Sequence, residues 1–118
     1  SISTLEIVKN SEKFERSLGL CAAYIKASRN HESEKKCTEA IENIKAFDSS
    51  SARISYLKSI SYSNRAVARH LNQDNTGAMS DLVNAILIDD NPITRGNLAE
   101  LKRLTDVTSA DNSIISAE

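Results

Sequence analysis

Alanines recur at helical spacings in the segment 61–91, on both sides of the polar stretch Asn72–Asn75. Ala66 precedes this stretch and Ala78 follows it, so a turn at Asn72–Asn75 brings the two methyl groups toward each other. Two helices approach closely only where the facing side chains are small. Ala85, two turns beyond Ala78, offers a second small contact for the helix that follows. The spacing therefore predicts a tightly packed helical hairpin.

Apolar residues elsewhere in the chain are also three or four positions apart, which indicates amphipathic helices. The stripes are Phe14, Leu18, Cys21, Ile25; Cys37, Ile41, Ile44, Phe47; Ile54, Leu57, Ile60, Leu71; and Leu98, Leu101, Leu104. Ser3, Ser33 and Ser51 precede helices as N-cap residues, and Pro92 suits the first turn of the last helix. Short polar breaks make consecutive helices antiparallel neighbours. We expect an all-α fold of two antiparallel helical hairpins and a fifth helix; a four-helix bundle with an appendage is the alternative.

Length and charge indicate one helical domain without an electrostatic preference for nucleic acid. The chain has 118 residues, three glycines, one proline and a net charge of −1, and nothing in it approaches the apolar run of about 20 residues that spans a membrane. Arg65 and Arg69 are expected to be solvated or to pair with neighbouring acidic residues rather than to bind an anion. We expect the domain to cover residues 1–108 and residues 109–118 to form a flexible polar tail.

The hairpin in 61–91 resembles the tetratricopeptide repeat (TPR), a helix–turn–helix unit of about 34 residues. The matching residues are Asn64, Arg65, Ala66, Ala68, Ala78, Asp81, Leu82, Ala85, Ile86, Ile88, Asp89 and Asn91. Asp90 stands where the family usually has proline. A fainter second copy is found at a shift of 41 residues, which aligns Cys37 with Ala78 and Ile41 with Leu82. The resemblance implies a TPR-like fold of about two repeats plus a C-terminal capping helix.

The resemblance also implies a function. TPR proteins bind other proteins or peptides in a groove lined by the first helix of each repeat. The corresponding residues here are Ile60, Ser63, Asn64, Val67 and His70. We therefore expect a non-catalytic scaffold that contacts a protein or peptide partner through these five side chains.

Cys21 and Cys37 are the only cysteines, and both lie on apolar stripes on either side of the turn near 29–33. Antiparallel helices can bring them close enough for a disulfide, which would stabilise the fold by about 3 kcal/mol. The alternative is a pair of buried, unreactive thiols, because cysteine packs like a small apolar residue. A bridge favours a secreted or periplasmic location, in keeping with a sequence that opens on Ser1 rather than Met. Two thiols favour the cytoplasm.

The sequence contains no phosphate-binding glycine loop and no HExxH motif, and neither His31 nor His70 stands at a familiar metal spacing from the cysteines. We therefore expect no metal, no cofactor and no enzymatic activity. Two other functions stay open. One is a structural homodimer in which a second copy covers the exposed stripe of the third helix. The other is a redox protein that uses Cys21 and Cys37, which their apolar placement disfavours.

Overall fold

The computed structural model describes the backbone of residues 3–117 and the side chains of residues 3–106, and every regular element in this part is a helix. The helices are α1 (Thr4–Lys26), α2 (Asn30–Ile44), α3 (Ala52–Leu71), α4 (Asn75–Ile88) and α5 (Pro92–Ala117). α1 and α2 form one hairpin, and α3 and α4 form a second. The prediction of an all-α fold built from antiparallel helical hairpins is confirmed.

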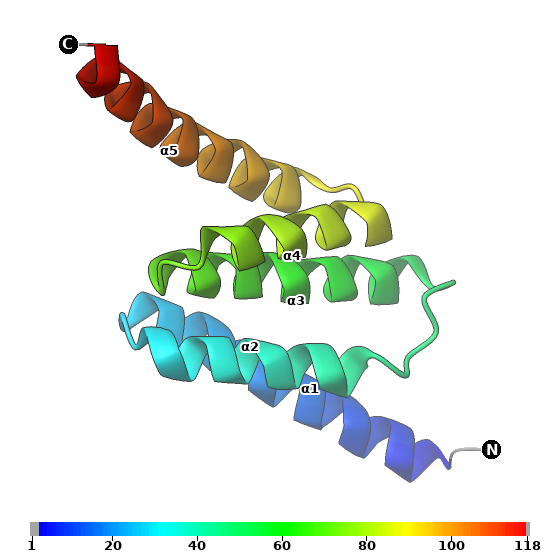
Figure 1. Ribbon diagram of the computed structural model, residues 1–118. Coiled ribbons are helices and arrows are strands. Elements are labelled where there is room, and N and C mark those ends of the chain that lie inside the picture. The colour runs from blue at the N-terminus through cyan, green and yellow to red at the C-terminus, as the bar shows by residue number, and fades with distance from the viewer. Residues whose placement is uncertain (1–2, 118) are drawn as a thin grey trace.

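The five helices form an elongated stack in chain order (Figure 1). α2 and α4 lie toward the viewer and α1 and α3 lie behind them. α2 packs on α3 and so joins the two hairpins, while α5 contacts both α3 and α4 and diverges from them toward its C-terminal end. Among the described residues α4 makes no contact with α1, which a closed four-helix bundle requires. The stack therefore replaces the bundle as the description of the fold.

Side chains at the helix starts agree with the expected caps of α1 and α3 and disagree with the expected cap of α2. Ser3 and Ser51 cap α1 and α3, because each Oγ accepts a backbone N–H three residues further on (3.2 Å and 3.4 Å). Asn91 caps α5 in the same way through Oδ1 (3.0 Å). The prediction that Ser33 caps the second helix is wrong. α2 already begins at Asn30, and the buried Ser33 hydroxyl donates to the Asn30 carbonyl at 2.9 Å.

The turns inside the two hairpins have the same backbone geometry and lie 45 residues apart. Ser28 and Gln73 both adopt the left-handed conformation (φ 59° and 67°), and the next N–H in each turn bonds to a carbonyl five residues earlier (2.9 Å and 2.8 Å). This motif reverses the chain within a few residues, which is why α2 starts before Ser33. The hairpins correspond at a shift of 45 residues rather than 41, because the shorter shift aligns the apolar stripes about one helical turn out of step.

The alanines predicted to bring the helices of the second hairpin together do so. Ala66 and Ala78 are each 1 % exposed and share one buried cluster with Leu82 of α4 and Leu101 of α5. Ala68, on another side of α3, packs instead against the first hairpin. Small side chains on α3 thus permit close contact with all four other helices.

Gly19 lies on the exposed side of α1, where an added Cβ would find no neighbouring atom within 4 Å. We expect Gly19→Ala to raise the free energy of unfolding by about 0.5–1 kcal/mol, because alanine loses less backbone entropy in a helix. Urea denaturation measures the change. Gly77→Ala is the matched control, since its Cβ would collide with the Asp74 carboxylate that caps α4, and it should give no gain. A destabilised Gly19→Ala protein would contradict the expectation.

α5 runs to Ala117, past the predicted end of the domain at residue 108. The side chains of the predicted flexible tail, residues 109–118, lie outside the described part of the chain. The description of that segment as a polar tail therefore stays a prediction.

Candidate functional site

Cys21 and Cys37 form a disulfide that links α1 to α2 inside the first hairpin. Their sulfur atoms are 1.98 Å apart, their Cα atoms are 4.7 Å apart, and both residues are fully buried against Ala68 of α3. At the 45-residue shift the two cysteines correspond to Ala66 and Leu82, which pack together in the second hairpin. The bridge therefore occupies a structural position in the core. The alternative of two free thiols does not hold, and the complete burial of both sulfur atoms disfavours redox chemistry at this pair.

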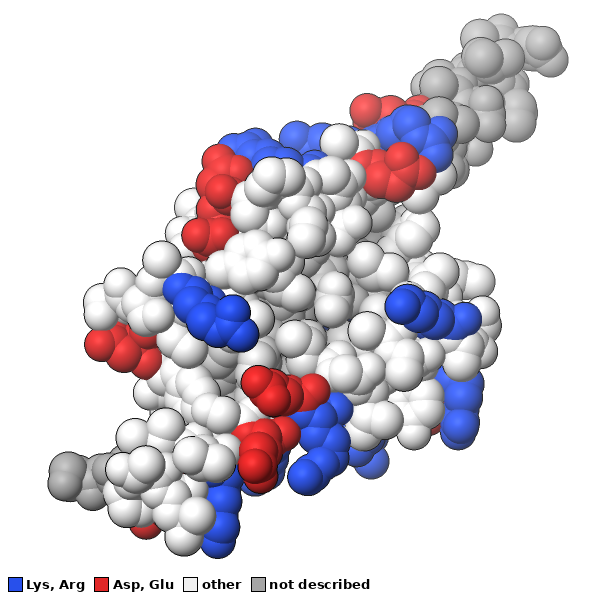
Figure 2. All heavy atoms as spheres, turned by 180° about the vertical axis from the view of Figure 1, so that it is seen from behind, with Lys and Arg blue, Asp and Glu red and all other residues white. Residues whose placement is uncertain are grey.

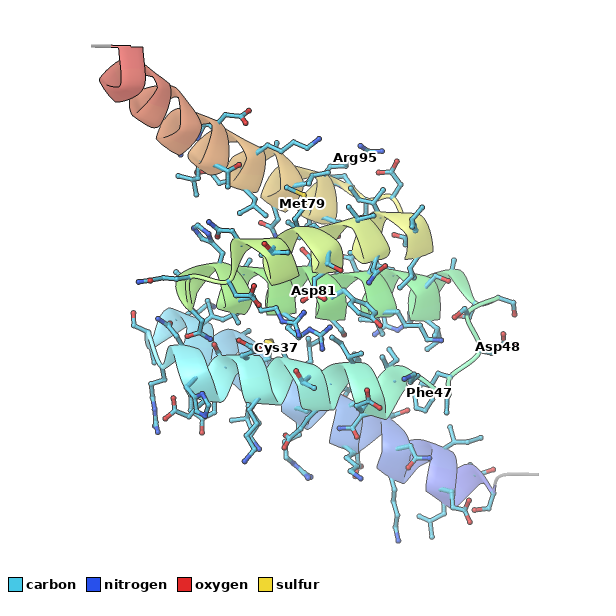
Figure 3. All side chains as sticks on the ribbon, viewed as in Figure 1. Cys37, Phe47, Asp48, Met79, Asp81 and Arg95 are labelled. Carbon is cyan, nitrogen blue, oxygen red and sulfur yellow. A yellow bond between two sulfur atoms is a disulfide. The ribbon has the colours of Figure 1, made fainter. Side chains whose placement is uncertain are left out.

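A buried carboxylate holds the second hairpin together and is labelled in Figure 3. Asp81 of α4 is 1 % exposed. It accepts two hydrogen bonds from Arg65 (2.9 Å and 2.8 Å) and a third from Arg69 (3.1 Å), both on α3. The hydrogen bonds to Asp81 raise the pKa of the Arg65 guanidinium. The bidentate geometry is the strong form of an arginine–carboxylate pair.

The same two arginines extend to the first hairpin. Arg69 Nε donates to Glu34 at 3.4 Å and Arg65 Nη1 donates to the Thr38 hydroxyl at 3.4 Å, and both acceptors belong to α2. Of the two alternatives expected for Arg65 and Arg69, the structure shows the pairing with acidic neighbours. The guanidinium N–H groups of both arginines donate to acceptors within the protein. These arginines therefore link the two hairpins and are not a site for an anionic peptide.

The five side chains on α3 that the sequence singles out for binding fall into two environments. Val67 and His70 line an open pocket, and the His70 ring bonds to Asn75 Oδ1 through Nδ1 (2.7 Å). Ser63 is fully buried and accepts a hydrogen bond from Asn97 of α5 (2.7 Å). Ile60 and Asn64 are half-buried and lie outside the wall of this pocket.

The pocket lies in the wedge where α5 diverges from the second hairpin (Figure 1) and has a volume of about 180 Å³. Its lining from α3 and α4 is mostly apolar, and α5 contributes the rest; the residues are Ala66, Val67, His70, Leu82, Asn97, Glu100, Leu101 and Leu104. Arg103 hydrogen-bonds to Glu100 and lowers the pKa of that carboxyl, so the one acidic group on the rim is ionised and already paired. The pocket is thus suited to an apolar group.

Figure 2 shows the back of the molecule, opposite to the side seen in Figure 1. Acidic and basic side chains are scattered over this face, including its middle, with uncharged surface between them. Charges of both signs that are interspersed in this way give no single-sign field to steer a charged ligand.

Sequence reasoning found the α3 wall of the pocket and missed its α5 wall. Leu101 and Leu104 were recognised only as part of a helical stripe, and Asn97 and Glu100 not at all. The signal that was present is the stripe of Leu98, Leu101 and Leu104, which shows that one face of α5 is apolar. The direction in which α5 leaves the hairpin is a tertiary property that this pattern does not contain.

No protein-family model, curated protein or solved structure matches this chain. Within the described residues there is no cluster of three or more His, Cys, Asp or Glu side chains that could hold a metal ion. The helices described here also include none that is long and apolar enough to cross a bilayer.

Proposed function

We propose that this chain is a non-catalytic, TPR-like module that binds a protein or peptide segment, with the α3–α5 pocket receiving one apolar side chain of the partner. The observation that carries the proposal is the pocket itself. It is open, its floor is apolar, and Val67 and His70 in its wall are among the five positions that the TPR resemblance assigned to the groove.

The size of the pocket favours a side chain over a small molecule. Sites for drug-sized ligands and cofactors measure about 300–1,000 Å³, whereas this pocket measures about 180 Å³. Peptide recognition by helical grooves commonly depends on a few buried anchors, with surrounding contacts that exclude water. One leucine, methionine or phenylalanine side chain is the kind of anchor that an apolar pocket of this size accepts.

The charged residues around the pocket indicate which kind of residue flanks the anchor side chain in the partner. Glu100 is paired with Arg103 (2.5 Å), and Arg65 and Arg69 are turned toward Asp81. Among the residues that line the pocket, Glu100 is the only Asp, Glu, Lys or Arg, and it is already paired. We therefore expect a partner segment with uncharged residues beside the anchor. Its affinity should depend little on salt concentration.

The disulfide supports a proposal about location. A fully buried Cys21–Cys37 bridge is typical of proteins from oxidising compartments. We propose that the chain works outside the reducing cytosol, in a secreted or periplasmic setting.

A peptide selection tests the binding proposal. Phage-displayed random peptides would be selected on the immobilised protein, and the affinities of enriched peptides measured by fluorescence anisotropy. We expect an apolar anchor in the enriched sequences. We expect Val67→Glu, which places a charge in the pocket wall, to weaken binding about 30-fold or more, the loss typical of a buried anchor.

Leu5→Glu is the matched control, because Leu5 is also apolar but lies at the exposed start of α1, 62 % accessible. It should leave the affinity unchanged. Circular dichroism would verify that both variants keep the helical fold. Enriched peptides that bind the Val67→Glu protein as tightly as the original protein would refute the pocket as the binding site.

A further inference from the structure

The outer side of α4 exposes apolar side chains that the proposed groove does not use, and Met79 at its edge is half-buried and also packs against the core cluster of Ala66, Ala78, Leu82 and Leu101. Leu87 is 79 % exposed and Val83 is 47 % exposed, and both lie on the same face of α4 as Met79. Figure 1 shows α4 on the side toward the viewer, the opposite side from the face in Figure 2. Apolar side chains this exposed at successive turns of one helix are typical of a surface that another molecule covers.

The charge on α4 restricts what that molecule is. Asp81 is the only charged residue among the 14 residues of α4, and it points inward to Arg65 and Arg69. The outer face therefore carries no charge of its own. A two-fold symmetric contact brings the same surface of both copies together. A net charge on that surface would therefore face a charge of the same sign on the other copy. A charge-free helix face avoids that penalty, so it is suited to meet itself.

The shape of the face is also self-complementary. A shallow depression on α4, lined by residues of its first two and a half turns that include Met79 and Val83, adjoins the protruding Leu87. If two copies of α4 pack antiparallel with Val83 at the two-fold axis, Leu87 of each copy comes to lie opposite Met79 of the other. The protruding side chain of one copy then fills the depression of the other.

The polarity of the helix favours the antiparallel arrangement. The N-terminal end of a helix carries partial positive charge and the C-terminal end partial negative charge. Antiparallel packing places Asp90, which follows the end of α4, opposite Thr76 in the first turn of the other copy. A parallel arrangement would instead put the two C-terminal ends of α4, each with partial negative charge, side by side.

We infer that a second copy of this chain docks on the outer face of α4, through Met79, Val83 and Leu87, in an antiparallel two-fold dimer. This contact leaves the α3–α5 pocket open, so a dimer would present two pockets. A helix of 14 residues is about 21 Å long, which limits the interface to the small end of the specific range and the dimer to moderate affinity.

Analytical ultracentrifugation tests the inference on the full chain. Loading concentrations from about 1 μM to about 1 mM cover the dissociation constants that a small interface gives. We expect a reversible monomer–dimer equilibrium. Leu87→Glu should raise the dissociation constant at least about 30-fold, and the Leu5→Glu protein should dimerise like the original. A monomer at every concentration would overturn the inference.

Cysteine cross-linking tests the geometry. Both native cysteines are bonded to each other, so an introduced thiol has no internal partner. Val83→Cys at the two-fold axis should form a covalent dimer under mild oxidation. Thr76→Cys should not, because its two copies would lie about 21 Å apart along the helices. A dimer that survives Leu87→Glu, or one that fails to link through position 83, uses another face and rejects the α4 contact.

Discussion

Asp81→Ala is expected to lower the free energy of unfolding by about 3 kcal/mol. Removing one partner of a buried ion pair costs about 3–5 kcal/mol, because the remaining charge stays desolvated without compensation. Here two arginines lose their acceptor at once, but their side chains keep 14 % and 23 % exposure and can turn partly to solvent. We therefore place the effect at the lower end of that range. Urea denaturation followed by circular dichroism measures it.

The effect of Asp81→Ala should include both hairpins, because Arg65 and Arg69 also bond to Thr38 and Glu34 of α2. Amide hydrogen exchange should show weaker protection in α2 as well as in α3 and α4. Asp90→Ala is the matched control: Asp90 and Arg95 form an ion pair in which both side chains are 57 % exposed, so stability should be nearly unchanged. Equal effects of the two substitutions would show that the buried position of Asp81 has no special importance.

Reducing the disulfide is expected to cost about 3 kcal/mol. The bridge joins residues that are 16 positions apart, and a loop of that length restricts the unfolded chain by roughly this free energy. The double variant Cys21→Ala with Cys37→Ala should lose as much, with an added contribution from the space that the sulfur atoms leave. Urea unfolding of the oxidised protein, the reduced protein and the double variant gives the comparison.

The second hairpin supplies a matched variant for this prediction. Cys21→Ala with Cys37→Leu gives the first hairpin the pair found at Ala66 and Leu82. This variant should be more stable than the double alanine variant, since leucine refills part of the core, yet still less stable than the oxidised protein. If reduction changed the free energy of unfolding by less than about 1 kcal/mol, the covalent constraint would contribute little beyond packing.

Local features of the chain were predictable because they depend on neighbouring residues. The caps at Ser3 and Ser51 and the turn at Asn72–Asn75 follow from side-chain and backbone chemistry over three or four positions. The start of the second helix was misplaced because Ser33 has the chemistry of an N-cap residue, although the chain already reverses at Ser28.

The site depended more on tertiary structure. Val67 and His70 were selected through the TPR resemblance, but the pocket exists because α5 diverges from the second hairpin and adds Asn97 and Leu101 to its wall. The same packing removes Ser63 from the surface through its hydrogen bond to Asn97. A one-dimensional pattern reports which face of a helix is apolar, and it does not report how far a later helix covers that face.

Sequence by itself determined the helices, the close contact at Ala66 and Ala78, and the two candidate partners for a disulfide, since periodicity and side-chain size act along and across a single hairpin. Only the tertiary structure decided that the cysteines are bridged, that Asp81 joins two arginines, and that the groove residues divide between a buried contact and an open pocket. Those outcomes depend on the angles at which whole helices meet. Such angles are set by the summed packing of residues far apart in the chain.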